Sequence, residues 1–419
     1  MNIENIKKPN ITSERINQKV MPILRKMEKS GIKLDCDAVR KLDRKLSKRV
    51  SQIEEQIVKF SGHEFNISSP TQMAEVLFVE MKLPTEDLKK TKTGISTAAN
   101  ELNKIKDKHP IIVLILENRE LSKLISTYLR PLPMIVDKSS RLHTTYGMET
   151  ATGRLTSSEP NLQNIPIKGK FGGEIRKAFI ASEGMKLIAA DYSQIELRII
   201  ASISHDTAMI DAFKRGDDIH SKTAAEIFNT TLKKVTRDQR RIAKAVNFGI
   251  VYGQTPYGLS QALNIGIDKA AEYILHYFEI HQGIRRYINE MVEKAHKDGY
   301  VETIFGAKRF LPNIDSRIRY IAESEERMAI NMPVQGTAAE ILKLAMIALD
   351  KRLVSYNKKK PVPSKMLLTV HDELVVEAPS EDAQEVAKIV KESMEEVVTL
   401  EVPIIAELGV GDNWQEAKS

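Results

Sequence analysis

The sequence of 419 residues contains a single cysteine, Cys36, and therefore excludes an intrachain disulfide. One cysteine is typical of a protein from a reducing cytosol. No apolar run approaches the roughly 18–20 residues that a membrane span needs. Residues 1–10 lack both the apolar core of a signal peptide and the arginine bias of a transit peptide. These absences predict a cytoplasmic protein with no signal or transmembrane segment.

Neither sign of charge dominates the chain. The 63 Lys and Arg against 56 Asp and Glu give a formal net charge of +7. This excess suits a polyanionic partner, but many ordinary enzymes are equally basic, so charge alone leaves both interpretations open. Hydrophobic residues at 42% and charged residues at 28% are typical of a soluble globular enzyme rather than a disordered or membrane protein. The length predicts two to three domains, and we find no internal repeat or low-complexity linker.

The N-terminal part of the chain has helical periodicity. Apolar residues at helical spacing predict a helix over 20–29 and a long charged helix over 38–60. Residues 69–72 have the pattern of a capping box with proline at the first helical position, which predicts a helix through Phe78. A second pair of helices is predicted over 97–128.

Strand patterns occur in two places that lie far apart in the sequence. Apolar runs bounded by polar turns predict strands over 177–180 and 187–190, and helical periodicity then extends from 196 to about 296. Two further runs predict a hairpin over 365–378, and another strand is predicted over 403–407. The two strand-bearing parts could form one sheet with a helical insertion between them.

Three carboxylates stand where such strands end. Asp191 follows an apolar strand directly, and Asp372 and Glu373 lie at the predicted hairpin turn. Hard oxygen ligands of this kind suit Mg²⁺, which keeps waters and phosphate oxygens in its other positions. Two such ions, about 3.5–4 Å apart, can activate a hydroxyl and stabilise a leaving oxygen in phosphoryl transfer. For any one of these residues alone, an ordinary turn residue is the more common explanation, so the surrounding motifs must decide.

A helix over 240–253 carries cations and aromatics on one face. Arg240, Lys244, Phe248 and Tyr252 recur every four residues, so they wind slowly along the helix. The cations can meet a triphosphate and the rings can stack on a base and sugar. An amphipathic helix whose aromatics face the core explains the spacing equally well.

Two other segments have polar chemistry that does not decide their role. Residues 150–155 and 160–166 are polar and punctuated by glycine and proline, so they can contact a nucleic-acid backbone, but a long structured loop is the simpler interpretation. Lys89, Lys90 and Lys92 form a basic loop that, taken alone, is more typical of a solvated surface turn.

Together these motifs resemble those of the family A DNA polymerases, the bacterial DNA polymerase I family. Residues 191–198 resemble motif A, the helix over 240–253 resembles motif B, and 371–373 resemble motif C. Residues 150–166 and 335–338 match further segments of the same family. The matches come in family order and at family-like spacing, and the similarity runs from about Met21 to Trp414.

The resemblance implies an α+β chain with a right-hand polymerase fold, in which an antiparallel-sheet palm carries helical fingers and a helical thumb. The predicted parts are an N-terminal helical lead-in packing on the palm (1–30), the thumb (31–130), the first part of the palm (131–206), the fingers (207–325) and the second part of the palm (326–419).

The resemblance also implies a role for each motif residue. Asp191 and Asp372 would be the metal ligands and, with Glu373 in support, the catalytic residues. Glu196 would act as the steric gate against a ribose 2′-OH. The residues implied to bind the nucleotide are Gln194, Glu196, His220, Arg240, Lys244, Phe248 and Tyr252. Those implied to bind DNA are Arg154, Asn164, Gln335, His371, Lys89, Lys90 and Lys92, with Arg154 and Gln335 contacting the minor groove at the primer end.

The implied cofactors are two Mg²⁺ ions, for which Mn²⁺ can substitute, and the implied partners are primer–template DNA and dNTPs. We expect a monomer. Before residue 145 no Asp is followed two positions later by Glu, so the metal motif of a proofreading exonuclease is lacking, and we expect neither this activity nor a 5′ nuclease. Glu196 argues against a related RNA polymerase. A reverse-transcribing polymerase on RNA templates stays open, and a non-catalytic DNA-binding relative is disfavoured by the intact carboxylates.

Overall fold

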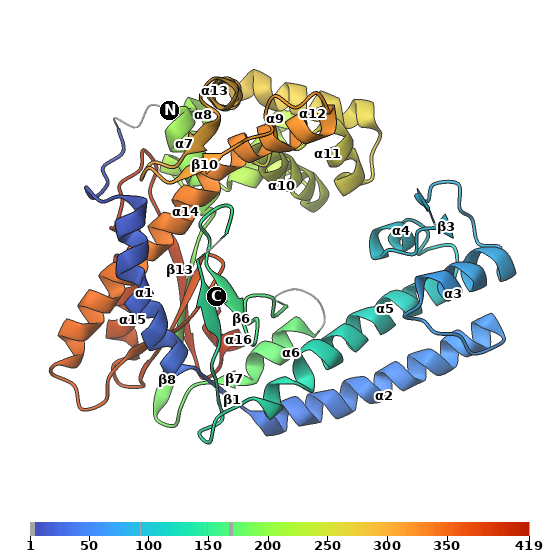
Figure 1. Ribbon diagram of the computed structural model, residues 1–419, viewed down its shortest axis with the longest axis horizontal. Helices are drawn as coiled ribbons and strands as arrows, with labels where there is room; N and C mark the ends of the chain where they lie inside the picture. Colours follow the sequence, from blue (N-terminus) through green and yellow to red (C-terminus); the bar gives the residue numbers. More distant parts are fainter. Residues whose placement is uncertain (1–4, 93, 149, 167–170, 419) are drawn as a thin grey trace. The chain divides into compact units, whose positions relative to one another are not determined.

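A computed structural model describes residues 5–92, 94–148, 150–166 and 171–418, which belong to two compact units. The first unit comprises Met1–Ile32, His143–Asn164 and Ala181–Ser419, and the second comprises Lys33–Leu142 and Ile165–Ile180. The first residues of the predicted lead-in, 1–4, lie outside the described part of the chain. Helices and antiparallel sheets in both units confirm the predicted α+β class (Figure 1).

The second unit is built on two long helices, α2 (Cys36–Ser61) and α5 (Pro110–Leu124), which pack against each other (Figure 1). The side chain of Asp35 accepts a hydrogen bond from the backbone N–H of Ala38 at 2.9 Å and so caps the start of α2. This helix ends where Gly62 adopts a left-handed conformation with φ of 83°, which glycine tolerates well. The other elements of this unit are α3 (Pro70–Ala74), η1 (Glu75–Glu80), β2 (Lys90–Thr91), β3 (Gly94–Ile95), α4 (Ala99–Lys104), η2 (Ile125–Leu129), η3 (Leu132–Met134), α6 (Gly172–Lys177) and a sheet of β4 (Arg141–Leu142), β1 (Ile32–Leu34) and β7 (Phe179–Ile180).

Two local predictions in this unit were partly wrong. The predicted capping box is only half formed: Ser69 accepts from the backbone N–H of Gln72 at 3.4 Å, but the side chain of Gln72 accepts from the N–H of Asn66 at 2.7 Å instead of reaching back to Ser69. The strand predicted over 177–180 begins only at Phe179, because the residues before it bury Ile175 in the short helix α6.

The first unit contains the main sheet, which is antiparallel and has the strand order β11–β12–β8–β13. Its strands are β8 (Met185–Tyr192), β11 (Lys365–Val370), β12 (Glu373–Pro379) and β13 (Ala406–Gly411). The predicted hairpin is therefore present, and it shares one sheet with the strand predicted over 187–190. The other strand predicted in that part of the sequence, over 177–180, is β7 and belongs to the sheet of the second unit. The last strand begins at Ala406, three residues later than expected from 403–407.

Helices pack around this sheet. α15 (Ala383–Glu395) lies against β8 and β13, and α1 (Ser13–Ser30) lies against β11 and along α14 (Arg319–Asn357) (Figure 1). Buried residues such as Ile188 and Leu374 join strands and helices in one hydrophobic core. The other elements of this unit are β5 (Thr145–Gly147), β6 (Thr156–Ser158), α7 (Ile195–Ser204), α8 (Thr207–Arg215), α9 (Ile219–Ile227), η4 (Leu232–Lys234), α10 (Arg237–Val251), α11 (Pro256–Leu263), α12 (Ile267–Ile280), α13 (Gln282–Asp298), β9 (Tyr300–Glu302), β10 (Lys308–Phe310) and α16 (Trp414–Ala417).

Within the described residues, α14 is the one helix long and apolar enough to cross a membrane by length and composition. However, 83% of its most apolar window is buried inside the structure. Its apolar side chains therefore belong to the protein core, as in the central helix of many globular proteins.

Candidate active site

The carboxylates predicted as catalytic lie together at one end of the main sheet. Antiparallel pairing places Glu373, the first residue of β12, opposite Asp191 of β8. Glu373 thus begins the strand, whereas Asp372 stands in the tight turn after His371, whose φ of 55° is left-handed. The backbone N–H of Tyr192 donates to the carbonyl oxygen of Asp372 at 3.2 Å and ties this turn to the end of β8.

The electrostatics of this end of the sheet are those of crowded, partly buried carboxylates. Burial raises the pKa of Asp372 to about 6; Arg154 opposes this rise, while Glu196 and Asp191 add to it. Burial likewise raises the pKa of Asp191, against the effect of the Lys418 ammonium. The carboxylates therefore repel one another, and a bound cation would relieve that repulsion.

Glu373 is held by two side chains near the end of the chain. The buried indole of Trp414 donates its Nε1–H to Glu373 Oε1 at 2.5 Å. The Lys418 ammonium donates to Glu373 Oε2 at 2.8 Å and to Asp191 Oδ2 at 3.3 Å. Both oxygens of the Glu373 carboxylate are thus engaged by the protein itself.

The donor set suits a hard divalent cation. Among residues 5–92, 94–148, 150–166 and 171–418, no group of three or more His, Cys, Asp or Glu is arranged to hold a metal ion. Asp191 and Asp372 still fit Mg²⁺, because this ion commonly takes one or two protein carboxylates and fills its other positions with water and phosphate oxygens. The Lys418 ammonium, 3.3 Å from Asp191 Oδ2, already places one positive charge beside these carboxylates.

Arg154, Glu196 and Tyr252 form a hydrogen-bonded network beside these carboxylates. Glu196 is buried at the start of α7; its Oε1 accepts from Arg154 Nη2, and its Oε2 accepts from the Tyr252 hydroxyl at 2.7 Å. Burial and then the charge of Glu196 raise the pKa of Tyr252. The structure therefore brings Arg154, predicted to contact DNA, to two residues predicted to contact the nucleotide.

The helix predicted over 240–253 is present as α10, and the cations and aromatics spaced four residues apart lie on it or directly after it. Its capping box is complete, because Thr236 accepts from the N–H of Gln239 while the Gln239 side chain accepts from the N–H of Thr236. Lys244 is exposed, whereas Phe248 and Tyr252 are half-buried, with ring centroids 6.1 Å apart and an interplanar angle of 30°. The two aromatic side chains thus pack partly against the core and leave part of their surface exposed to solvent.

His220 and Arg240 share an anionic partner that the sequence analysis did not name. The Asp218 carboxylate accepts from Arg240 Nε at 2.5 Å and Nη2 at 3.2 Å, and it caps α9 by accepting from the N–H of His220 at 3.1 Å. Burial favours the neutral acid, but hydrogen bonds from Arg240 and Ser221 lower the pKa of Asp218 to about 2. Burial, followed by the charge of Lys244, lowers the pKa of His220 to about 4, so its imidazole is neutral near pH 7.

The remaining predicted residues lie in different places. Gln194 precedes α7 with φ of 55°, and its Oε1 is buried without a hydrogen-bond partner among the described residues. Gln335 is half-buried within α14, and Asn164 follows the loop in which Gln163 donates to the carbonyl oxygen of Thr369 at 3.4 Å. The predicted basic-loop residues, all exposed in the second unit, are Lys89, Lys90 and Lys92.

Sequence reasoning missed Asp218, Trp414 and Lys418. A signal for Asp218 existed, because an aspartate directly before a helical run is a typical N-cap. Its pairing with Arg240 had no local signal, since the partners belong to different helices. No sequence pattern connects Trp414 and Lys418 with Glu373.

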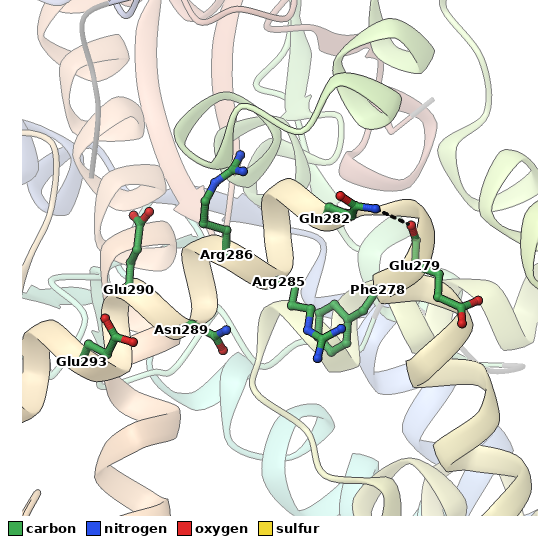
Figure 2. A pocket seen from close by; sticks show the side chains of 8 residues that line it. All are labelled: Phe278, Glu279, Gln282, Arg285, Arg286, Asn289, Glu290 and Glu293. Carbon is green, nitrogen blue, oxygen red and sulfur yellow. Dashed lines mark hydrogen bonds between the residues drawn. The ribbon is translucent and has the colours of Figure 1, made fainter.

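A surface pocket of about 610 Å³ lies away from these residues, at the end of α12 and along α13. Figure 2 shows Arg285 and Arg286 on this helix among acidic and amide side chains, with Gln282 donating to the carbonyl oxygen of Glu279 at 3.4 Å. None of the predicted site residues lines this pocket.

Comparisons with known proteins identify relatives of this chain. The model of DNA polymerase family A matches residues 36–416. The chain is 47% identical over 398 residues to DNA polymerase I of Deinococcus radiodurans, covering 94% of this chain and 41% of the relative. It is 44% identical over 406 residues to the thermostable DNA polymerase I of Thermus aquaticus, covering 96% of this chain and 48% of the relative. The chain thus spans less than half the length of these two relatives.

A solved structure of the POL domain of Pol1 from M. smegmatis, in complex with DNA primer-template and dNTP, has a TM-score of 0.91 to this chain. The sequence identity is 38%, and the match covers 96% of this chain and 70% of that one. A likeness this close over nearly the whole chain confirms the predicted right-hand fold.

Proposed function

Because the chain belongs to DNA polymerase family A, we propose that it is a DNA-directed DNA polymerase that adds dNTPs to the 3′ end of a primer. The observation that carries this proposal is the meeting of Asp191, Asp372 and Glu373 at one end of the main sheet. The network of Arg154, Glu196 and Tyr252 adjoins them, so chemistry and substrate selection would share one site.

In this proposal Asp191 and Asp372 hold two divalent cations, Mg²⁺ with Mn²⁺ as a substitute. When bound, these ions would activate the primer hydroxyl and stabilise the leaving oxygen of the pyrophosphate. The raised pKa values of both aspartates, caused by burial, are those of carboxylates that gain most from a nearby cation. Glu373 supports the site without ligating, because Trp414 and Lys418 engage its two oxygens.

We assign nucleotide binding to the face of α10 and the residues around it. Arg240 and Lys244 would contact the triphosphate, and Phe248 would lie against the sugar, with Gln194 and Tyr252 completing the pocket. His220 is neutral near pH 7, so it would act as a hydrogen-bonding group toward the β-phosphate. Glu196 would exclude a 2′-OH; its two hydrogen bonds leave the carboxylate little freedom to move aside, as a steric gate requires.

We assign primer–template contacts to Arg154, Asn164, Gln335 and His371 in the first unit. The three exposed lysines of the second unit's basic loop would contact duplex phosphates, which fix register without reading sequence. The second unit overlaps the span proposed as the thumb, 31–130, and the main sheet belongs to the spans proposed as the palm, 131–206 and 326–419. The fingers over 207–325, the lead-in over 1–30, a monomeric state and a place in the cytoplasm stay predictions.

Primer extension on matched DNA and RNA templates, with dNTPs and rNTPs supplied in separate reactions, tests the proposed function. We expect rapid extension only with dNTPs, and faster on DNA than on RNA. Faster extension on RNA would replace the proposal with a reverse-transcribing role, and no extension on either template would contradict catalysis.

A further inference from the structure

The side chain of Lys418 lies where two carboxylates converge, and it is only 21% exposed. Its ammonium is 2.8 Å from Glu373 Oε2 and 3.3 Å from Asp191 Oδ2. Register pairing sets Asp191 between Glu373 on one neighbouring strand and Glu407 on the other. Lys418 therefore contacts two carboxylates at a point where three acidic residues of the main sheet are neighbours.

The contacts of Glu373 explain how the lysine is held in place. Glu373 is 2% exposed, and its other oxygen accepts from the Trp414 indole. A buried carboxylate fixed on both oxygens gives the ammonium a rigid anchor. Trp414 and Lys418 lie on or next to α16, which packs on β8 and β13, so this anchor belongs to the fold of the sheet.

The second contact of the lysine falls on an oxygen that the proposed function requires for a metal ion. Asp191 Oδ2 cannot bind an ammonium and a divalent cation closely at the same time. The two cations would repel one another strongly in a partly buried site. The contact to Asp191 is also the longer of the two, so Asp191 is the partner that separates more readily.

We propose that Lys418 is an internal counter-cation that occupies Asp191 in the substrate-free protein and competes with divalent metal for that carboxylate. This inference rests on the proposed function, since it takes Asp191 as a metal ligand. Glu373 anchors the lysine, so metal entry requires the ammonium to move away from Asp191 while it stays on Glu373. The free protein therefore binds divalent metal weakly, and an incoming triphosphate, which adds negative charge, favours loading.

Direct binding of Mn²⁺ to the protein without DNA or nucleotide tests this competition, measured by loss of the free-ion electron paramagnetic resonance signal. Lys418→Met keeps an unbranched side chain of nearly the same length and removes its charge, and Lys418→Arg keeps the charge. Lys186→Met is the matched control, because Lys186 of β8 pairs at 2.6 Å with Asp412, the residue after β13, and its loss changes the net charge equally. Asp191→Asn reports whether the bound ion uses Asp191, and circular dichroism checks that each variant is folded.

We expect Lys418→Met to bind Mn²⁺ about tenfold more tightly than the parent, as removal of a unit charge a few ångströms away predicts. Lys418→Arg and Lys186→Met should bind like the parent. Unchanged or weaker binding by folded Lys418→Met, with Asp191→Asn still weakening binding, would overturn the competition and leave the metal assignment standing. Binding that Asp191→Asn does not weaken would contradict the metal assignment and this inference together.

Discussion

Replacing Asp218 with Asn removes the charge that holds Arg240 while keeping the cap of α9, because Asn and Asp cap helices equally well. Burial alone would raise the pKa of Asp218, but hydrogen bonds from Arg240 and Ser221, together with the charge of Arg240, lower it from 3.8 to about 2. At about 1.4 kcal/mol per pKa unit, that difference corresponds to an unscreened contribution of about 2.4 kcal/mol. The two side chains are 38% and 45% exposed, so solvent screening reduces the contribution to about 1 kcal/mol.

This contribution acts on stability and on nucleotide binding in opposite directions. A lowered carboxylate pKa adds stability above the unfolded value of 3.8, and the addition is lost as the pH falls toward about 2. Asp218→Asn should therefore unfold about 1 kcal/mol more easily at pH 7, with a difference that vanishes across this acidic range. If a triphosphate must displace Asp218 from Arg240, the same variant should bind dNTP about fivefold more tightly.

Single-turnover incorporation at varied dNTP concentration gives the nucleotide dissociation constant, and urea unfolding gives the stability. Asp217→Asn is the matched control, since this neighbouring aspartate pairs with Arg215 at 3.0 Å, whereas Arg240 pairs with Asp218. Weaker dNTP binding by folded Asp218→Asn would refute the displacement argument and show that Asp218 orients Arg240 for the triphosphate.

The remaining predictions concern sugar choice, DNA affinity and proofreading. Glu196→Ala should increase ribonucleotide use, and Phe248→Tyr should improve dideoxynucleotide use by adding a hydroxyl near the sugar; competition assays with unchanged ratios would reject the role of the residue changed. Replacing Lys89, Lys90 and Lys92 with Ala should lower affinity equally for any duplex and flatten its salt dependence, whereas an unchanged slope would remove this loop from the DNA interface. The 419-residue chain should leave a mismatched primer end intact in Mg²⁺ without nucleotides, and release of the terminal nucleotide by a pure sample would contradict this.

Features encoded by local periodicity could be predicted from the sequence. The apolar runs before Asp191 and on both sides of Asp372 indicated strands, and the four-residue spacing from Arg240 indicated one face of a helix. Even there, the strand expected from 177 was shorter, because burial of Ile175 favours a helical turn just before it.

Contacts between distant residues were beyond such patterns. Arg154 and Glu196 are 42 positions apart, and Lys418 and Asp191 are 227 positions apart, so their pairing depends on strand order and helix packing. The sequence indicated the chemistry of Arg154 and Glu196 through a family resemblance, but not their contact. Lys418 had no such signal, since a lysine near a chain end is usually solvated.

The most direct test of the proposed catalysis is single-turnover incorporation by Asp191→Asn and Asp372→Asn, combined with a primer–template binding titration. Each change removes a carboxylate charge from the proposed metal site, so incorporation should fall by about a thousandfold or more while DNA affinity stays nearly unchanged. Glu407→Gln is the control, because Glu407 lies opposite Asp191 on β13 and has no proposed metal contact; it should incorporate at nearly the parent rate. Loss of the aspartate charge should lower the incorporation rate by several factors of ten, because transition-state stabilisation is lost. An incorporation rate within about tenfold of the parent, in either aspartate variant, would contradict the assignment of these residues as catalytic metal ligands.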